Sequence, residues 1–452
     1  MTQLARKLHT LDYFTLGFGA MIGVGWLILM NDWLERGGPW GGIIGFLLGG
    51  IMLLPIGYVY GRLVMAIPDS ASEIAYTARV FPASVSFLSG WMMLPAYLAV
   101  CPWESVAIGR VASYIFPGLE RMELYRVGGQ PIFLPNLILG LVLTALIVYV
   151  NYRGIHVSAG FQNWTTAGAL ALFVIFTLSG LAKGTIRNTL PPFSHASWVS
   201  ILLVLQIVPY FMTGFESVPK CAEEASPEFR QRGFFRAIMA ALFAGAAFYC
   251  IIIFVAGYSW PWQQLVAQPL ATTYALQHAI GAQWVVNMVL VAALLSLVKI
   301  FNATFLVSTR MFFALGRREM IDARVSRLHE RYRTPWVAVV IVGLFTAAGT
   351  FLGRAILVPI TEVGSMAAAC GWLSSCAAYI GIEKSKRERV IAILGAMVSL
   401  VLIAMKVCWF VPGHFSRWEW ITLGLWLAIG VFARYYGKAG SARTVAEGAT
   451  GN

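Results

Sequence analysis

The stretch LGFGAMIGVGWLILMNDW, residues 16–33, decides the interpretation of this chain, because it is as apolar as a membrane helix and yet rich in glycine. Its closely spaced glycines are Gly17, Gly19, Gly23 and Gly25. Each glycine inside a helix costs about 1 kcal/mol relative to alanine. Close helix packing would explain them, because small residues let two backbones approach. A break in the helix, where free N–H groups can bind an anion, would explain them equally well.

A second interrupted segment is SILLVLQIVPYFMTGFESVPKCAEEA, residues 200–225. Its apolar run contains Pro209 and Pro219, and a proline removes one helical N–H. Glu216 lies between them, and a carboxylate this deep in an apolar segment is a candidate functional residue. Two interrupted membrane helices in the two halves of a chain are typical of inverted-repeat transporters, in which the breaks form the binding site. The second segment therefore favours a functional break around Gly23.

The composition of the whole chain indicates a lipid environment. Of the 452 residues, 59% are hydrophobic and 12% are charged, whereas a soluble domain has about 25% charged residues. Apolar stretches of the ~20 residues that cross a bilayer recur along the chain, and they do not alternate as barrel strands do. We predict an all-α integral membrane protein with 12 transmembrane helices, at about residues 11–30, 38–66, 84–116, 131–151, 161–182, 198–219, 236–258, 283–315, 336–352, 357–381, 389–411 and 418–436.

The basic residues predict the orientation of these spans. Lys and Arg are concentrated in the loops on the side of the N-terminus, and such loops are cytoplasmic by the positive-inside rule. We predict a multi-pass protein of the cell (inner) membrane with both termini in the cytoplasm. Residues 1–10 would be the cytoplasmic N-terminus, and residues 437–452 a disordered cytoplasmic tail. The first apolar segment lacks a cleavage pattern and is interpreted as a retained span.

Several motifs resemble those of the amino acid–polyamine–organocation (APC) superfamily, over almost the full length of the chain. Residues 19–25 are similar to the first-span signature of that superfamily, and residues 213–218 with 222–224 to its sixth-span signature. Shorter similarities lie at residues 87–91, 151–154, 301–303 and 308–310. Two positions depart from the pattern. Residues 69–72 replace a frequent Gly-Gly pair, and Ala169 stands where some proton-coupled members have a lysine.

The resemblance implies a leucine-transporter-type fold that works by alternating access. In that fold, helices 1 and 6 are discontinuous. Residues 11–182 would form a first five-helix repeat, residues 198–382 a second, inverted five-helix repeat, and residues 389–436 the two extra helices 11 and 12.

The resemblance also implies where a substrate binds. The backbone from Ile22 to Trp26 would receive a carboxylate, and the carbonyls from Tyr210 to Thr213 an amine. Tyr210 or Phe215 would close over the substrate. The tryptophans Trp26 and Trp103 are set deeper than an interfacial belt requires and are pocket candidates. The full expected set is Ile22, Gly23, Val24, Gly25, Trp26, Trp103, Tyr210, Phe211, Thr213, Gly214 and Phe215.

Charged residues within the spans are candidates for coupling. Glu104 and Lys299 lie near the middle of the third and eighth spans. A lone buried charge is costly, so we expect an ion pair, either Glu104–Lys299 or Glu216–Lys299. Such a pair could only lock the packing, could titrate with transported protons, or could contact a charged substrate. Arg310 is near the end of its span and is expected to snorkel to the interface.

Several other polar residues are candidates for gating, coupling or cation binding. Glu223 and Glu224 could form an inner gate or simple loop salt bridges. Asn302 is a further coupling candidate. Ser308 and Thr309 offer hydroxyls where sodium-coupled relatives place a cation, although paired small hydroxyl residues are common in helices.

These features predict a secondary active transporter, a permease that moves an amino acid or related amine by proton symport or exchange. A sodium-coupled amino acid symporter is the alternative. A membrane-embedded enzyme would need a cluster of His, Cys or carboxylates on facing helices, and a receptor would favour a soluble output domain. The sequence indicates neither. We expect no catalytic residue, cofactor, metal or nucleic-acid partner. The expected partners are a small-molecule substrate, the lipid bilayer and a co-transported proton.

Overall fold

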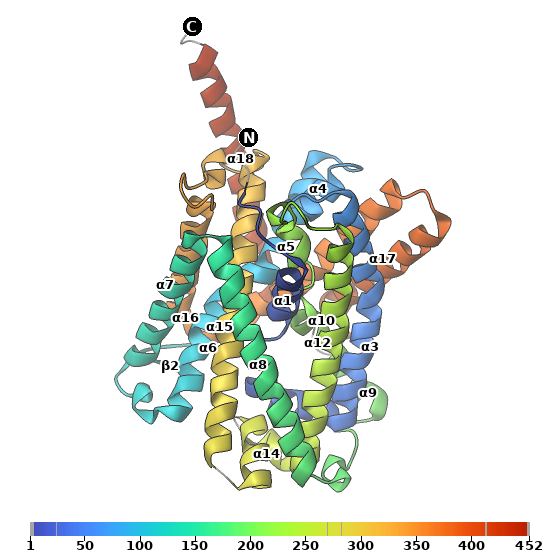
Figure 1. Ribbon diagram of the computed structural model, residues 1–452, viewed down its shortest axis with the longest axis vertical. Helices are drawn as coiled ribbons and strands as arrows, with labels where there is room; N and C mark the ends of the chain where they lie inside the picture. The colour runs from blue at the N-terminus through green and yellow to red at the C-terminus, as the bar shows by residue number, and fades with distance from the viewer. Residues whose placement is uncertain (1–3, 24, 269, 282, 412–413, 450–452) are drawn as a thin grey trace.

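The computed structural model describes residues 4–449 apart from residues 24, 269, 282, 412 and 413, and it is almost entirely helical (Figure 1). The first half of the chain contains α1 (Thr10–Met21), α2 (Gly25–Ile28), α3 (Met30–Ala66), α4 (Glu73–Thr77), α5 (Ala83–Leu98), α6 (Val100–Ile115), η1 (Pro117–Glu120), β1 (Glu123–Val127), β2 (Gln130–Phe133), α7 (Leu134–Arg153), α8 (Ile155–Lys183) and η2 (Ile186–Thr189). The second half contains α9 (Ser197–Leu205), α10 (Val208–Met212), α11 (Ser217–Lys220), η3 (Ala222–Glu224), α12 (Arg232–Ser259), α13 (Trp262–Val266), α14 (Ala271–Ile280), α15 (Gln283–Arg317), η4 (Ala323–Ser326), α16 (Trp336–Ile382), α17 (Lys386–Val407) and α18 (Arg417–Ala449).

Nine helical stretches of the described residues are long and apolar enough to cross a membrane. The predicted spans 11–30 and 198–219 are not among these nine, because short helices replace one continuous span in both places. The predicted span 418–436, within α18, is also not among them. The predicted spans 336–352 and 357–381 belong to one long helix, α16, which has a non-helical residue at Gly353. The polytopic helical membrane architecture agrees with the prediction.

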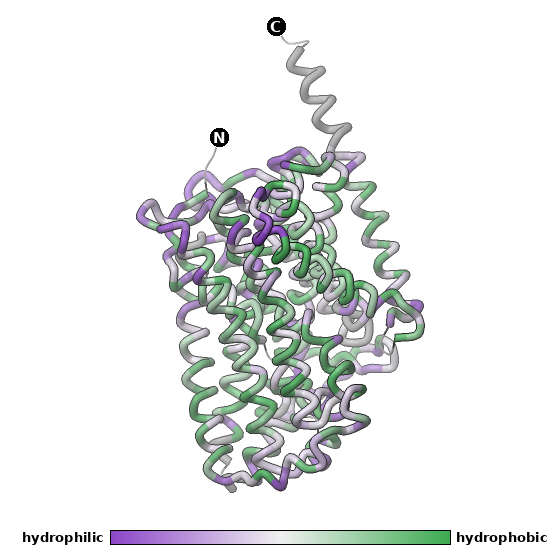
Figure 2. The backbone as a smooth tube through the Cα atoms, turned by 90° about the vertical axis from the view of Figure 1, so that its right-hand side faces the viewer, coloured by the Kyte–Doolittle hydropathy of each residue, from purple (hydrophilic) through white to green (hydrophobic). Residues whose placement is uncertain are grey.

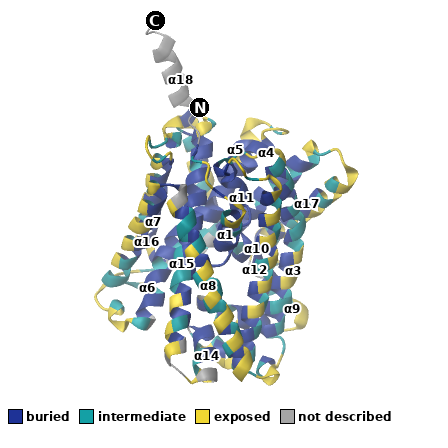
Figure 3. Ribbon diagram, in the orientation of Figure 1, coloured by how far each residue is buried: buried dark blue, intermediate teal, exposed yellow. Residues whose placement is uncertain are grey.

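The helix α1 lies at the centre of the bundle, where it contacts α8, α12 and α15 (Figure 1). Buried residues concentrate around it, and exposed residues lie on the outer helix faces and in the loops (Figure 3). Large apolar side chains such as Trp164 and Leu178 are exposed on the outside, and hydrophobic residues follow the helices along the bundle (Figure 2). An apolar exterior of this kind is stable against lipid tails and not against water.

One segment differs from the sequence prediction. The residues before α7 form an antiparallel hairpin of β1 and β2, so the predicted span 131–151 begins too early. Gly128 and Gly129, both with positive φ, make its two-residue turn. The backbone of α18 extends to Ala449, and the disordered tail expected for residues 437–452 stays a prediction. The described residues before α1 and the C-terminal part of α18 lie at the same end of the molecule (Figure 1).

Candidate functional site

The first break separates α1 from α2. The last intrahelical bond of α1 runs from the N–H of Ile22 to the carbonyl of Phe18, at 2.9 Å, and Gly25 begins α2. The N–H of Gly23 has no hydrogen-bond partner among the described residues. A Cβ atom on Gly23 would lie 2.8 Å from Ile300 Cδ1, so any larger residue here would have to displace the Ile300 side chain of α15. Val24 lies outside the described residues.

The second break separates α10 from α11 and lies directly against the first. Thr213 is extended, and Gly214 has a φ of +149°. A Cβ atom on Gly214 would lie 2.6 Å from the backbone nitrogen of Met21, so only glycine fits here. Tyr249, from α12, donates its hydroxyl to the carbonyls of Met21 (2.8 Å) and Phe211 (3.2 Å). One side chain thus links the two breaks, and sequence reasoning missed it because its partners are far away along the chain.

Glu216 supports the second break from within the protein. The fully buried carboxylate accepts hydrogen bonds from the Gly214 N–H (2.9 Å) and from Nε1 of Trp372 (3.0 Å). Phe215 is also fully buried and stacks on Trp372 with 5.9 Å between the ring centroids. Of the two aromatic residues expected to close over a substrate, Tyr210 lines the central cavity and Phe215 does not.

A small central cavity of about 30 Å³ lies beside the two breaks. Seven of the predicted site and coupling residues line it: Gly23, Gly25, Trp103, Glu104, Tyr210, Phe211 and Thr213. Four predicted binding residues, Ile22, Trp26, Gly214 and Phe215, are not part of its lining. Sequence reasoning missed Ala20, Met21, Leu29, Ala96, Tyr97, Val100, Ile300 and Thr304. The spacing of Tyr97, Val100 and Glu104 on one helical face could have identified the first two.

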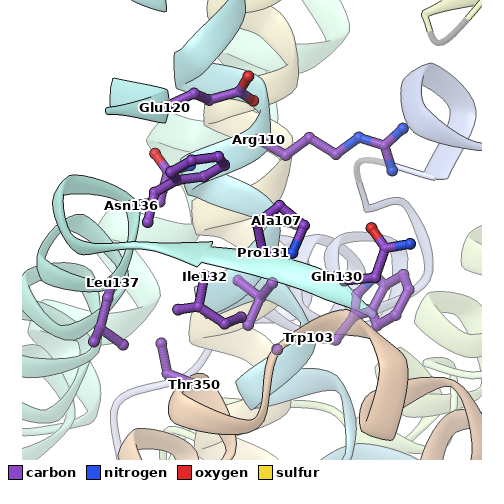
Figure 4. A pocket seen from close by; sticks show the side chains of 13 residues that line it. Trp103, Ala107, Arg110, Glu120, Gln130, Pro131, Ile132, Asn136, Leu137 and Thr350 are labelled. Atoms are coloured by element: carbon purple, nitrogen blue, oxygen red, sulfur yellow. The ribbon is translucent and has the colours of Figure 1, made fainter. Parts of the chain in front are cut away.

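Two larger cavities lie next to the central one. One of about 400 Å³ shares Leu29, Trp103, Tyr210 and Phe211 with it. The other, of about 330 Å³, lies beside the hairpin and shares Trp103 with both (Figure 4). Arg110 lines the two larger cavities. Trp103 is therefore a common wall between the hairpin side of the protein and the central cavity.

The end of the molecule that carries the N-terminus is closed by ion pairs. Arg317 contacts Glu223 at 2.5 Å and Asp69 at 3.3 Å, and Arg318 contacts Asp69 at 2.5 Å. The N-terminal segment also packs there, because the backbone of Leu8 forms a bridge with Ala225. This closure includes Asp69, one of the positions that departs from the APC pattern.

Arg310 belongs to the same end of the protein but is completely buried. It binds the Glu224 carboxylate through Nη2 at 2.7 Å and Nε at 3.2 Å. The expectation that Arg310 snorkels to the interface is therefore wrong, because the nearest counter-charge lies inside. A second buried pair, Lys220 with Glu73 at 2.7 Å, was not foreseen, since no local pattern connects residues 147 positions apart.

Among the described residues, Lys299 makes no salt bridge within 4.0 Å to Glu104 or Glu216, although the charges of Lys299 and Glu104 act on each other. Lys299 Nζ and Glu104 Oε2 are both buried and have no hydrogen-bond partner among the described residues. The Lys299 ammonium instead lies 5.4 Å from the centroid of the Phe18 ring. Glu216 accepts from neutral donors, so it does not pair with Lys299 either. The position of a residue along a span gives its depth in the membrane, but not the direction in which its side chain points.

The remaining coupling candidates bond mostly within the bundle. Asn302 accepts hydrogen bonds from Asn151 (3.0 Å) and Ser158 (3.1 Å), which joins α15 to α7 and α8. Ser308 and Thr309 donate their hydroxyl protons to carbonyls of their own helix, at 2.8 and 2.6 Å. These contacts connect α15 to its neighbours and to its own backbone carbonyls.

Comparison with known proteins gives a consistent result. The model of the family described as amino acid permease matches residues 13–436. The chain is 24% identical to the methylthioribose transporter of Bacillus subtilis over 449 residues, 96% of this chain and 93% of that protein. It is 23% identical to the branched-chain amino acid permease BcaP of Bacillus subtilis, over 80% of this chain and 77% of that protein. It is 25% identical to the cationic amino acid transporter 9 of Arabidopsis thaliana, over 72% of this chain and 58% of that protein.

Proposed function

The chain belongs to the amino acid permease family of the APC superfamily, and from this premise we propose that it is a secondary carrier that works by alternating access. As a member of that family, it is a membrane transporter of amino acids or related compounds and not an enzyme. Its substrate would be a small amino acid or amine that binds at the central cavity. The observation that carries this proposal is the contact between the two helix breaks, at Gly214 and Met21, beside that cavity.

The two breaks suit the two ends of an amino acid. Free N–H groups at a helix break attract an anion, and free carbonyls attract a cation. The unpaired N–H of Gly23 supports carboxylate binding by the backbone of residues 22–26. The carbonyls of residues 210–213 would bind the ammonium group, and Tyr210 would cover the substrate. Ile22, Trp26, Gly214 and Phe215 would support this site from behind.

We further propose the topology that the family resemblance implies. The protein would have twelve spans, with residues 11–182 and 198–382 as inverted repeats and residues 389–436 as two added helices. Both termini would be cytoplasmic, in the cell membrane. Supporting this arrangement, the described residues before α1 and the C-terminal part of α18 lie at one end of the molecule (Figure 1). The ion pairs of Arg317 bridge helices at that end, and the two cavities next to the central one lie towards the other end, as expected of a state that faces outward.

For coupling, we propose proton symport or exchange. The carboxylates Glu104 and Glu216 and the ammonium of Lys299 are buried ionisable groups near the breaks, and such groups commonly belong to proton pathways. Sodium coupling through Ser308 and Thr309 is the weaker proposal, because both hydroxyl protons are donated within α15.

Uptake into proteoliposomes tests the function. The purified protein should accumulate at least one radiolabelled amino acid or amine under an inward proton gradient, or exchange it against the same compound inside. A sodium gradient of equal size should add little. Empty liposomes are the control. If no compound of a broad panel enters under any gradient or by exchange, the proposal of amino acid or amine transport fails.

A further inference from the structure

One outer face of α7 is apolar along its length and basic at its end. Ile138, Val142, Leu146 and Tyr149 are exposed, and the exposed Arg153 is the last residue of the helix. Their intervals of three and four residues place all five on one side of α7. The part from Ile138 to Tyr149 is about 17 Å long at 1.5 Å per residue, close to the ~15 Å of hydrocarbon in one leaflet. This face therefore matches the depth of one leaflet, with a positive charge at its end.

The loop before α16 brings a second arginine to the same place. The guanidinium carbon of Arg153 lies 5.5 Å from the ring centroid of Tyr332, and that of Arg331 lies 5.6 Å from the same centroid. Arg153 also lies over the ring of Tyr149, at 5.5 Å, and its Nη1 donates to the Tyr149 hydroxyl at 2.7 Å. Aromatic faces attract guanidinium groups and restrict where they lie. Two arginines from distant parts of the chain are thus gathered around one ring.

The loop that carries Tyr332 is attached to the end of α7. The Thr334 hydroxyl donates to the Tyr152 carbonyl at 2.9 Å, and the His329 ring lies 5.1 Å from the Tyr152 ring. Within the loop, the His329 N–H donates to the Thr334 carbonyl at 2.8 Å, and His329 Nδ1 accepts from the Tyr332 N–H at 3.3 Å. The fold therefore defines the position of the Tyr332 ring relative to α7.

Neither arginine has a carboxylate partner. In the part of the chain that the structure describes, no carboxylate oxygen lies within 4.0 Å of a side-chain nitrogen of Arg153 or Arg331, and this includes the neighbouring Glu330. By contrast, the nearby Arg324 pairs with Asp322 at 2.6 Å. Two like charges beside one ring repel each other, and an anion that contacts both would offset the repulsion. The planar guanidinium group is well suited to phosphate.

The apolar surface continues from α7 onto α16. The two helices approach closely at Gly343, where a Cβ would lie 2.7 Å from Val148 Cγ2. Trp336, Val340 and Leu344 are exposed and follow one another at the spacing of one helix face. Tryptophan is enriched at the boundary between headgroups and hydrocarbon, and α7 lies at the outer edge of the bundle (Figure 1). A phosphate site thus adjoins a surface that acyl chains can cover.

We propose that Arg153 and Arg331 bind the phosphate of an anionic phospholipid of the surrounding bilayer, and that its acyl chains lie along α7 and α16. Basic pockets between membrane helices on the cytoplasmic side recognise such headgroups. A choline headgroup carries its own cation, which the two arginines repel. The inference rests on the proposed topology, which places this end of the molecule in the cytoplasm, and it does not depend on the substrate. The bound lipid holds the loop between α15 and α16 against α7.

Native mass spectrometry of the full chain in a neutral detergent tests the proposal. Palmitoyl-oleoyl phosphatidylglycerol is compared with palmitoyl-oleoyl phosphatidylcholine, so that the two lipids differ only in the headgroup. We expect tighter binding of phosphatidylglycerol. Arg153→Gln combined with Arg331→Gln should weaken it about 30-fold, because each basic residue near a lipid surface contributes about fivefold in affinity. The same double variant should bind phosphatidylcholine as the original protein does.

A matched double variant separates the site from the overall charge. Arg387→Gln with Arg389→Gln removes the same charge from exposed positions at the start of α17 and should leave the phosphatidylglycerol affinity unchanged. Both double variants are checked for a monodisperse peak in size-exclusion chromatography. An equal loss of affinity in the two variants would overturn the proposal, because the lipid is then attracted by charge alone.

Glycerol 3-phosphate, which has the phosphate without acyl chains, separates a lipid from a soluble phosphate compound. It should not displace phosphatidylglycerol at concentrations at which dihexanoyl phosphatidylglycerol does. Displacement by glycerol 3-phosphate would assign the arginines to a soluble anion and overturn the proposal, as would equal binding of phosphatidylglycerol and phosphatidylcholine. Lipid binding is measured without any substrate, so this inference and the proposed transport function can fail independently.

Discussion

At the scale of single residues, Gly214 is the position with the least tolerance. Gly214→Ala would force a Cβ into a backbone that L-residues rarely adopt, 2.6 Å from the Met21 nitrogen. We expect a loss of about 1 to 3 kcal/mol in stability and a strong reduction of transport. Thermal unfolding in detergent, together with uptake, measures both effects.

Gly160→Ala is the matched control for this substitution. Gly160 lies in α8, and a Cβ there would have no atom within 4 Å. Alanine is the better helix former, so this variant should unfold at the same or a higher temperature. Equal stability of the Gly214 and Gly160 variants would show that the contact between the breaks is not tight in solution.

The sequence indicated which residues interrupt the helices better than it indicated which side chains contact one another. The glycines and prolines of residues 16–33 and 200–225 indicate breaks because their backbone chemistry is local. The partners of Glu104, Lys299 and Arg310 could not be predicted in the same way. Their contacts depend on which helix face meets which, and that is decided by the packing of the whole bundle.

At the scale of elements, the ion pairs that close the terminal end should differ in strength. Glu224→Gln would leave buried Arg310 without a counter-charge, which costs about 3 to 5 kcal/mol. Asp69→Asn removes partly exposed pairs with Arg317 and Arg318, worth no more than about 1 kcal/mol each. The melting temperature should fall far more for Glu224→Gln. Equal decreases would contradict the assignment of Glu224 and Arg310 as the main structural pair.

The elements themselves were predictable where hydrophobicity is continuous. Long apolar runs identified most of the membrane helices, and clustered glycine and proline identified the two interrupted ones. The hairpin at residues 123–133 was missed, because its strands are short, mix polar and apolar residues, and are partly exposed. No hydrophobic alternation distinguishes such strands from a loop.

At the scale of the whole molecule, the orientation in the membrane can be tested by labelling. In a variant without the native cysteines, Leu124→Cys in the exposed hairpin should react with an impermeant maleimide on intact cells. Glu330→Cys, exposed at the opposite end, should react only after permeabilisation. The reverse pattern would mean that the termini face outward.

The contact between Gly214 and Met21 also affects the entropy of binding. Two backbone segments at van der Waals distance cannot fluctuate independently, so a ligand group that orders one segment also orders the other. The second group of the same ligand then binds with a smaller loss of conformational entropy. We therefore expect the carboxylate and ammonium ends of a substrate to bind cooperatively. A fragment that carries only one of these groups should have a binding free energy well below half that of the whole substrate.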